Sequence, residues 1–261
     1  MKIISTNLTI LFIALTTGTT FCQSQKAPEP DITLPKIGKI ETKTTRDING
    51  SSWSVGGETM DRDFTIYENW KDYLVPLGIK KIRLQSGWAK TEKNKGEYDW
   101  DWLDSIVQDL HKKDIKPWIS LSYGNPIYKG GGTPYPSTTF PKGEAYAAWL
   151  DYVTACVTHY KDQVNEWEIW NEPNHPAHPT PLNEYVELVI RTSEIIREIQ
   201  PEAQIMTMAL AGVDIDYTFE ALSKIDSLCS LHLIDIVTYH PYNENPDDSY
   251  EQVELLRDTI Q

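Results

Sequence analysis

VNEWEIWNEPN, residues 164–174, joins a short apolar-rich run to an abrupt polar end. The Val, Trp and Ile residues of this stretch predict a buried strand, and Asn171-Glu172-Pro173-Asn174 ends that strand. The Glu172 carboxylate is therefore expected at the carboxyl end of a strand. In a parallel α/β barrel this end of the strands carries the chemistry, and Asn171 supplies a neutral hydrogen-bonding group for a hydroxylated ligand.

Strand-then-helix units are predicted on both sides of this stretch. Further strands are expected at 53–55, 81–85, 117–123, 204–208 and 234–240. Apolar residues at helical spacing follow each strand, at about 64–74, 102–110, 146–160 and 185–189, in one more segment after the fifth strand, and at 250–260. The loop at 124–141 is rich in Gly and Pro, and loops of such length are usually functional in compact domains.

This alternation favours a parallel sheet, and the single-domain length favours a barrel over an open doubly wound sheet. No Gly-x-Gly-x-x-Gly follows the first expected strand, so the main signal of a dinucleotide-binding fold is missing. A complete barrel has eight units. We therefore expect an α/β fold, a (β/α)8 TIM barrel, of which only about six of the eight units are present in residues 48–261, through truncation or gene decay.

Composition narrows the choice of partners. A formal net charge of −14 argues against nucleic acid and against an anionic membrane surface, because both would repel the chain. Nine Trp and fourteen Tyr suit barrel packing, and some of these rings suit stacking on sugars. The six His are scattered and show no zinc-site spacing, so neither a metal nor another cofactor is expected. Nothing in the sequence indicates an oligomeric state.

The N-terminus is typical of an export signal. Met1-Lys2 and the apolar run at 11–15 predict a signal peptide over residues 1–24, too short to span a membrane. Cys22 is an alternative site of lipoprotein anchoring, although the preceding Phe21 is larger than such signals usually allow. Residues 25–47 are expected to form a linker. Of the remaining cysteines, Cys156 and Cys229 are expected to be buried free thiols rather than a disulfide pair.

Trp167-Glu168-Ile169-Trp170-Asn171-Glu172-Pro173-Asn174 resembles the fourth-strand motif of the clan A glycoside hydrolases, most closely that of glycoside hydrolase family 39 and its relatives. The resemblance implies that Glu172 is the acid/base of a retaining two-carboxylate mechanism and that Asn171 hydrogen-bonds the 2-hydroxyl of the sugar. It also implies that Arg83 lies close to the nucleophile and helps to keep it ionised. The clan's nucleophile is a Glu at the end of the seventh strand. No strand is predicted after His240, so this Glu is expected beyond residue 261.

Several other polar and aromatic residues lie at expected strand ends. His240 and Tyr242 resemble the clan's sixth-strand pattern, in which an imidazole or a hydroxyl contacts the nucleophile or the sugar. Trp88 and His175 are further candidates for substrate binding, with capping of the barrel as the alternative for both. Three more residues at strand ends could either line the pocket or cap the barrel: Glu58, Tyr123 and Asn125.

Three remaining glutamates are better explained without catalysis. Glu92 stands in a Lys-rich segment and is expected to be a solvated loop charge. Glu166 and Glu168 precede the strand end, where structural roles are expected. For Glu168 we expect an ion pair with an arginine inside the barrel, because an unpaired buried carboxylate is costly.

These observations predict an exported glycoside hydrolase, periplasmic, cell-surface or extracellular, that acts on a poly- or oligosaccharide. The alternative is a non-catalytic carbohydrate-binding protein or a decayed glycosidase paralogue that keeps the cleft and lacks the nucleophile. A strand ending in Glu beyond residue 261 would separate the two. The sugar, the linkage and the choice between exo- and endo-action depend on loop shape and are not indicated by the sequence.

Overall fold

The computed structural model describes residues 37–38, 41–136, 139–177, 180–245 and 247–260. The expected signal peptide, Cys22 and most of the expected linker lie outside these residues. The chain divides into Met1–Ile40 and a compact unit, Glu41–Gln261, to which all the elements below belong. Within that unit, Thr45 is fully buried, and its hydroxyl donates to the carbonyl of Lys113 at 2.9 Å. The end of the expected linker is therefore packed on the domain.

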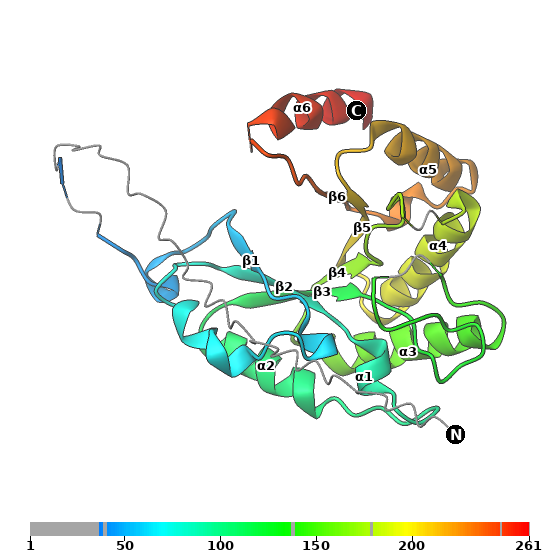
Figure 1. Cartoon of the computed structure of the whole chain (residues 1–261), viewed down its shortest axis with the longest axis horizontal. Helices are drawn as coiled ribbons and strands as arrows, with labels where there is room; N and C mark the ends of the chain where they lie inside the picture. The colour runs from blue at the N-terminus through cyan, green and yellow to red at the C-terminus, as the bar shows by residue number, and fades with distance from the viewer. Residues whose placement is uncertain (1–36, 39–40, 137–138, 178–179, 246, 261) are drawn as a thin grey trace, which may run out of the picture. The chain divides into compact units, whose positions relative to one another are not determined.

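Six strands form one parallel sheet in chain order. The sheet curls into an arc with helices α2 to α5 along its outer side (Figure 1). This arrangement confirms the expected partial (β/α)8 barrel. Among the described residues, the first and last strands each pair with only one neighbour. The strands are β1 (Ser54–Gly56), β2 (Lys81–Gln85), β3 (Lys116–Leu121), β4 (Glu166–Ile169), β5 (Gln204–Ala211) and β6 (Ile236–His240).

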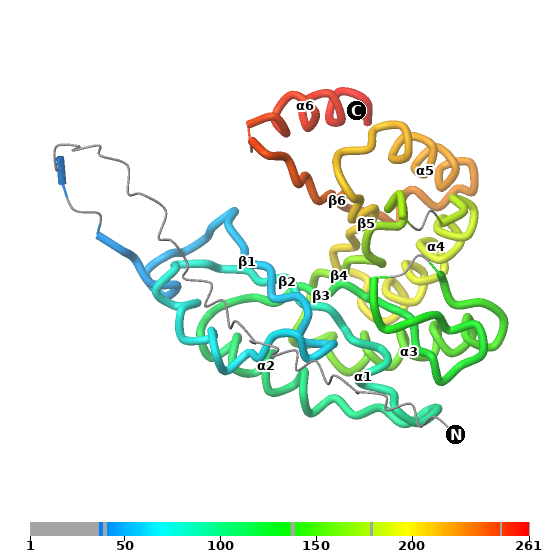
Figure 2. The backbone as a smooth tube through the Cα atoms, viewed as in Figure 1, coloured from blue at the N-terminus to red at the C-terminus, as the bar shows by residue number. Residues whose placement is uncertain are grey.

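From β2 onward, α-helices return the chain between successive parallel strands, whereas 3-10 turns connect β1 to β2 (Figure 2). The helices bury apolar faces against the sheet; α3, for example, buries Trp149, Tyr152 and Val153 completely. No helix among the described residues has the length and apolar character needed to cross a bilayer. The α-helices are α1 (Trp88–Thr91), α2 (Asp101–Lys112), α3 (Glu144–Tyr160), α4 (Leu182–Ile199), α5 (Ile215–Ser227) and α6 (Asp248–Ile260); the 3-10 turns are η1 (Thr45–Asp47), η2 (Met60–Arg62), η3 (Tyr67–Asn69), η4 (Lys71–Tyr73) and η5 (Leu231–Leu233).

The first expected helix is not formed. In place of a helix over 64–74, the chain makes the two 3-10 turns η3 and η4, separated at Trp70, whose φ of −135° is not helical. Tyr67 is buried and donates to Asp109 of α2 at 2.7 Å, whereas Phe64 and Tyr73 are exposed. The β-branched and aromatic residues here have low helix propensity, and the Tyr67 anchor sets the local path instead.

Two expectations about polar groups are wrong. Glu92 is fully buried, not solvated: it accepts from the indole of Trp88, from the Tyr128 hydroxyl at 2.6 Å and from the Gly96 amide at 2.6 Å. These three donors explain how a carboxylate is accommodated inside the fold. Cys229 is exposed, while Cys156 is buried as expected, and burial raises the pKa of the Cys156 thiol; both cysteines are free.

Candidate active site

The backbone delivers Glu172 to the carboxyl edge of the sheet through an unusual turn. After β4, Trp170 and Glu172 adopt φ angles of 68° and 50°, a region that non-glycine residues rarely occupy. Hydrogen bonds to both neighbouring strands hold this path. The Trp170 amide donates to Leu121 at 3.0 Å, and the Glu172 amide donates to Ala209 at 2.8 Å. The strained turn is therefore fixed by its surroundings.

Asn174 attaches the end of the motif to the neighbouring strand. Its side-chain oxygen accepts from the Ala211 amide at 2.9 Å, and its amide nitrogen donates to the Ala211 carbonyl at 3.2 Å and to Asp214 at 3.1 Å. Asp214 in turn caps α5 by accepting from the Tyr217 amide at 3.0 Å. Opposite the turn, the pairing of β5 with β6 is irregular between Thr207 and Leu210. The position of Glu172 therefore depends on β5 as much as on β4.

His240, the last residue of β6, contacts the Glu172 carboxylate. Its Nδ1 lies 2.9 Å from Glu172 Oε1, and the two side chains are 17% and 20% exposed. The hydrogen bond from His240 lowers the pKa of Glu172; partial burial acts in the opposite direction, and the charges of His240, His175 and Arg83 add to the lowering. In this arrangement Glu172 is held as a carboxylate.

Arg83 of β2 bridges four side chains on the inner face of the sheet, one of them Ser120, whose hydroxyl accepts from Nη2 at 3.3 Å. Its Nε donates to Glu168 at 2.8 Å, its Nη1 lies 3.1 Å from Glu58, and its Nη2 donates to Asn171 at 2.9 Å and also contacts Glu168. The predicted pairing of Glu168 with a barrel arginine is thus confirmed. Since Arg83 also holds the oxygen of Asn171, it fixes the orientation of the amide beside Glu172.

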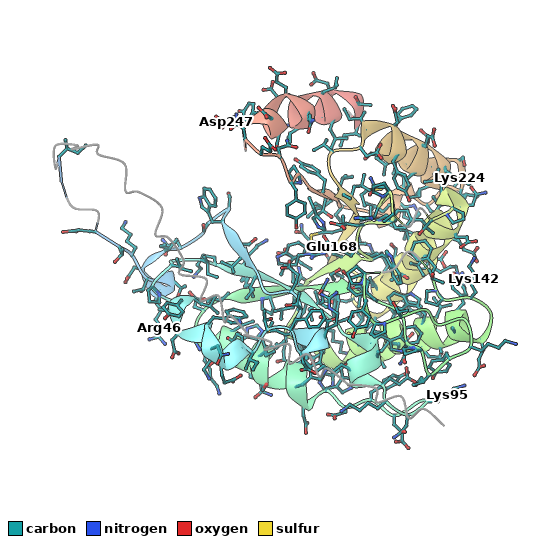
Figure 3. All side chains as sticks on the ribbon, in the orientation of Figure 1. Arg46, Lys95, Lys142, Glu168, Lys224 and Asp247 are labelled. Atoms are coloured by element: carbon teal, nitrogen blue, oxygen red, sulfur yellow. The ribbon has the colours of Figure 1, made fainter. Side chains whose placement is uncertain are left out.

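This ion pair lies deep in the fold. Glu168, labelled in the middle of the curved sheet in Figure 3, is fully buried and also accepts from Thr238 at 2.9 Å. Burial acts to lower the pKa of Arg83, but the carboxylates of Glu168 and Glu58 outweigh it and raise that pKa above its usual value. Arg83 therefore remains charged, and its charge is balanced by the carboxylates around it.

A cavity of about 740 Å³ opens at this end of the sheet. Its size lies within the usual range for small-molecule sites, and its polar groups can both donate and accept hydrogen bonds. Among the described residues, no cluster of three or more His, Cys, Asp or Glu side chains could hold a metal ion. The lining residues are Ser54, Gly56, Glu58, Thr59, Arg62, Arg83, Gln85, Trp118, Tyr123, Pro136, Glu168, Asn171, Glu172, Val237, Thr238, Tyr239, His240 and Tyr242.

Five of the seven candidate residues from the sequence line this cavity: Arg83, Asn171, Glu172, His240 and Tyr242. Tyr242 is 88% exposed and so belongs to the rim. Glu58 and Tyr123, for which capping the barrel was the alternative, also line the cavity. These residues come from five strands, β1, β2, β3, β4 and β6, or from the loops that follow them, as expected for the carboxyl end of a parallel barrel.

The other candidates lie elsewhere. Trp88 does not line the cavity: it is fully buried against Tyr128, Trp149 and Tyr152 and serves as a packing residue. Asn125 is also fully buried, and its amide donates to the Glu92 carbonyl at 2.9 Å.

His175 stands just beyond the turn and does not line the cavity either. Its amide donates to the Glu172 carbonyl at 3.1 Å, and its ring acts on Glu172 through charge. His175 therefore acts on Glu172 from outside the cavity lining.

The sequence interpretation missed several lining residues. Gln85 lies two positions after Arg83, on the same face of β2, so the strand periodicity could have identified it. It accepts from Arg62 at 2.7 Å and donates to the Tyr123 hydroxyl at 2.9 Å. Arg62 stands in the turn η2, and no periodic pattern identifies a cavity residue there. Trp118 could have been identified in a similar way, because it pairs in register with Arg83 on the neighbouring strand.

Replacing His240 with Ala should raise the pKa of Glu172 towards its ordinary value, because the His240 hydrogen bond is the largest cause that lowers it. A lowered pKa stabilises the fold above the pKa of the unfolded chain, and this stabilisation is lost as the pH falls through the folded-state pKa. His240→Ala should therefore reduce stability near neutral pH more than in acid. Carboxyl-carbon NMR titration, with Glu172→Gln for assignment, measures the shift. A smaller shift is expected for His175→Ala, and an unchanged Glu172 titration in His240→Ala would contradict the assigned cause.

Comparison with known proteins is consistent with the geometry of this site. The model of a family described as "Glycosyl hydrolases family 39" matches residues 75–254, more than half of the chain. A curated relative, the aryl-phospho-beta-D-glucosidase BglA of Bacillus subtilis, is 24% identical over 257 residues, which cover 90% of this chain and 50% of the relative. The chain spans half or less of the length of the curated relatives that it matches.

Solved structures share the fold. A family 39 beta-xylosidase from Caulobacter crescentus superposes with a TM-score of 0.60 and 25% identity, covering 79% of this chain and 49% of the xylosidase. A family 39 glycoside hydrolase from Bacteroides cellulosilyticus superposes with a TM-score of 0.54 and 20% identity, covering 72% of this chain and 38% of the other.

Proposed function

The chain belongs to glycosyl hydrolase family 39, and on this basis we propose that the protein hydrolyses O-glycosidic bonds of a poly- or oligosaccharide with Glu172 as the acid/base. One observation carries the assignment of Glu172. Its carboxyl group follows β4, lines a cavity of about 740 Å³, and lies beside Asn171 and within hydrogen-bonding distance of His240. The mechanism proposed is retaining.

In the first step, Glu172 protonates the departing oxygen while a second carboxylate attacks the anomeric carbon from the opposite face of the sugar. In the second step, Glu172 accepts a proton from the water that releases the sugar from this carboxylate. An acid must hold its proton at the working pH. The lowered pKa of Glu172 must therefore rise when substrate binds, through loss of the His240 hydrogen bond and through the charge of the second carboxylate.

Asn171 and Arg83 have supporting roles in this proposal. With its oxygen accepting from Arg83, Asn171 offers its amide N–H groups to a sugar hydroxyl, an interaction that strengthens in the transition state. Arg83 lines the cavity, and its positive charge favours the ionised form of a neighbouring carboxylate. His240 and Tyr242 complete the sugar-facing side.

The second carboxylate is proposed to be a Glu that follows a seventh strand outside the six strands described. Glu58 and Glu168 are the other glutamates lining the cavity, and both contact Arg83. Glu168 is fully buried, and its two oxygens already accept from Arg83 and Thr238. Glu58 leaves from β1 and does not match the position of the family's nucleophile.

Two further features are proposed on the same basis. The relatives named as a beta-xylosidase and an aryl-phospho-beta-D-glucosidase support a β-glycoside as the substrate. The charged start and apolar run of residues 1–24 support export, with residues 25–47 as a linker to the catalytic domain at 48–261. N-terminal sequencing of exported material that still begins at Met1 would contradict the export proposal.

The test of function is a panel of aryl β-glycosides, assayed with the product of the complete reading frame and with residues 1–261 alone. We expect hydrolysis only from a product that contains a further strand ending in Glu, because retaining chemistry needs two carboxyl groups about 5 to 5.5 Å apart. Hydrolysis by residues 1–261 that is abolished by Glu172→Gln would assign the nucleophile to one of the six strands. Absence of hydrolysis from the complete product would favour a carbohydrate-binding role.

A further inference from the structure

Two exposed aromatic rings lie beside the cavity, close in the chain to residues that line it. Phe64 lies between η2 and η3 and is 66% exposed, and Tyr135 belongs to the loop between β3 and α3 and is 50% exposed. Their ring centroids are 6.0 Å apart, and the ring planes differ by 23°. Rings in full face-to-face contact would approach to about 3.5–4.0 Å, so neither ring covers the face of the other. Apolar surface remains open on both.

This pair continues the cavity outward. Arg62 and Pro136 line the cavity, two residues before Phe64 and one residue after Tyr135. The Arg62 guanidinium lies 5.1 Å from the centroid of the Tyr123 ring and 6.0 Å from that of the Phe64 ring. A continuous series of rings and a planar cation therefore runs from the cavity wall at Tyr123 to the exposed ring of Phe64.

Arg62 is held in place by its other contacts. Its Nη2 donates to Gln85 at 2.7 Å, and its Nε lies 3.2 Å from the Asp61 carboxylate. These contacts fix the planar guanidinium beside the rings. Because Asp61 balances the charge of Arg62, this part of the surface has no strong preference for anionic ligands. The net charge of −14 also disfavours an anionic ligand.

The order of the strands places these rings relative to Glu172. Phe64 and Tyr135 come from segments after β1 and β3, whereas Glu172 and His240 follow β4 and β6 at the other side of the cavity. An acid acts on the departing oxygen, so the departing part of a glycan lies on the Glu172 side. The rings stand on the side of the part that is retained.

We propose that Phe64 and Tyr135 form a stacking platform for a second sugar unit, next to the unit whose bond is cleaved and on its retained side. The inference rests on the proposed function and deepens it: the ligand is a neutral oligosaccharide of at least two pyranose units, and the protein distinguishes it from a monosaccharide. Pyranose rings present C–H faces that pack on aromatic rings, while their hydroxyl groups stay in water.

The test is calorimetric titration of the full chain carrying Glu172→Gln, which slows any turnover, with xylose, xylotriose, glucose and cellotriose. At least one trisaccharide should bind more tightly than its monosaccharide. Phe64→Leu with Tyr135→Leu should weaken trisaccharide binding about three- to ten-fold, the usual value of an aromatic contact, and leave monosaccharide binding unchanged. Phe64→Trp should retain the preference for length, because it keeps a stacking face.

Tyr73→Leu is the matched control, since Tyr73 is 67% exposed and neither it nor the two residues on each side of it line the cavity. Circular dichroism checks that each variant is folded. If mono- and trisaccharides bind and the double variant binds the trisaccharide as tightly as the parent, the platform is refuted while the proposed function stands. If none of the four sugars binds the parent, the proposed carbohydrate function is refuted and the platform falls with it.

Discussion

Glu172→Gln should lower the turnover of the active protein by roughly two to four orders of magnitude, the usual contribution of general acid/base catalysis. The amide keeps the size and hydrogen-bonding capacity of the side chain but cannot transfer a proton. Steady-state kinetics on a natural glycoside measures the loss. Aryl glycosides with good leaving groups need less protonation, so their first step should be affected less, and this dependence separates a lost proton donor from a misfolded site.

Glu166→Gln is the matched control for this substitution. Glu166 is the first residue of β4, at the end opposite the turn that carries Glu172, and it pairs with Lys81 at 2.6 Å. Its replacement should leave turnover within a small factor of the parent. Undiminished turnover of a natural glycoside by Glu172→Gln would remove Glu172 from the mechanism.

Arg83→Leu is expected to destabilise the fold by about 3–5 kcal/mol, the usual cost of leaving a buried charge without its partner. Arg83 is 7% exposed and Glu168 is fully buried, so water cannot replace the guanidinium. Urea unfolding followed by tryptophan fluorescence measures the change in the free energy of unfolding.

A double replacement separates the unpaired charge from lost packing. Arg83→Leu with Glu168→Leu removes both charges, and it should recover much of the stability, because apolar side chains of similar size often substitute well for a buried ion pair. Arg191→Leu is the surface control. Arg191 and Glu194 are 56% and 46% exposed, and such pairs contribute about 0–1 kcal/mol. A double variant as unstable as Arg83→Leu would contradict the assigned cause.

The fold was predictable because each unit carries a local pattern. β2, β3 and β6 were expected from short apolar runs, and α2 and α3 from apolar residues at helical spacing. The parallel order followed from alternation alone. The segment 64–74 has the same spacing, but its path is decided by the contact between Tyr67 and Asp109, which are 42 residues apart. A local sequence pattern does not indicate a contact between residues so far apart in the chain.

The candidate site was predictable where a residue ends a strand and belongs to a motif, as for Glu172 and Asn171. Glu92 and Trp88 also follow a strand, but they bond to each other and turn inward. The lysines around Glu92 in the sequence suggested that it would be exposed to solvent. Instead it is buried, and the hydrogen-bond donors that stabilise it are Trp88, Gly96 and Tyr128, the last of which lies in a distant loop. Arg62 was missed for a related reason: its position in the cavity depends on Gln85 and Tyr123 and not on its own sequence context.

Asn174 and the Glu172 amide both bond to β5, and this has a consequence for transplanting the motif. The eight residues 167–174 form a continuous motif, but the position of the Glu172 carboxyl group depends on hydrogen bonds to the backbone of Ala209 and Ala211. Ala209 itself has a φ of 42°, within the irregular part of β5. If these eight residues were transferred to a barrel with a regular fifth strand, the Glu172 carboxyl group would take a different position and orientation. The unit that can be moved between scaffolds is thus a pair of adjacent strands.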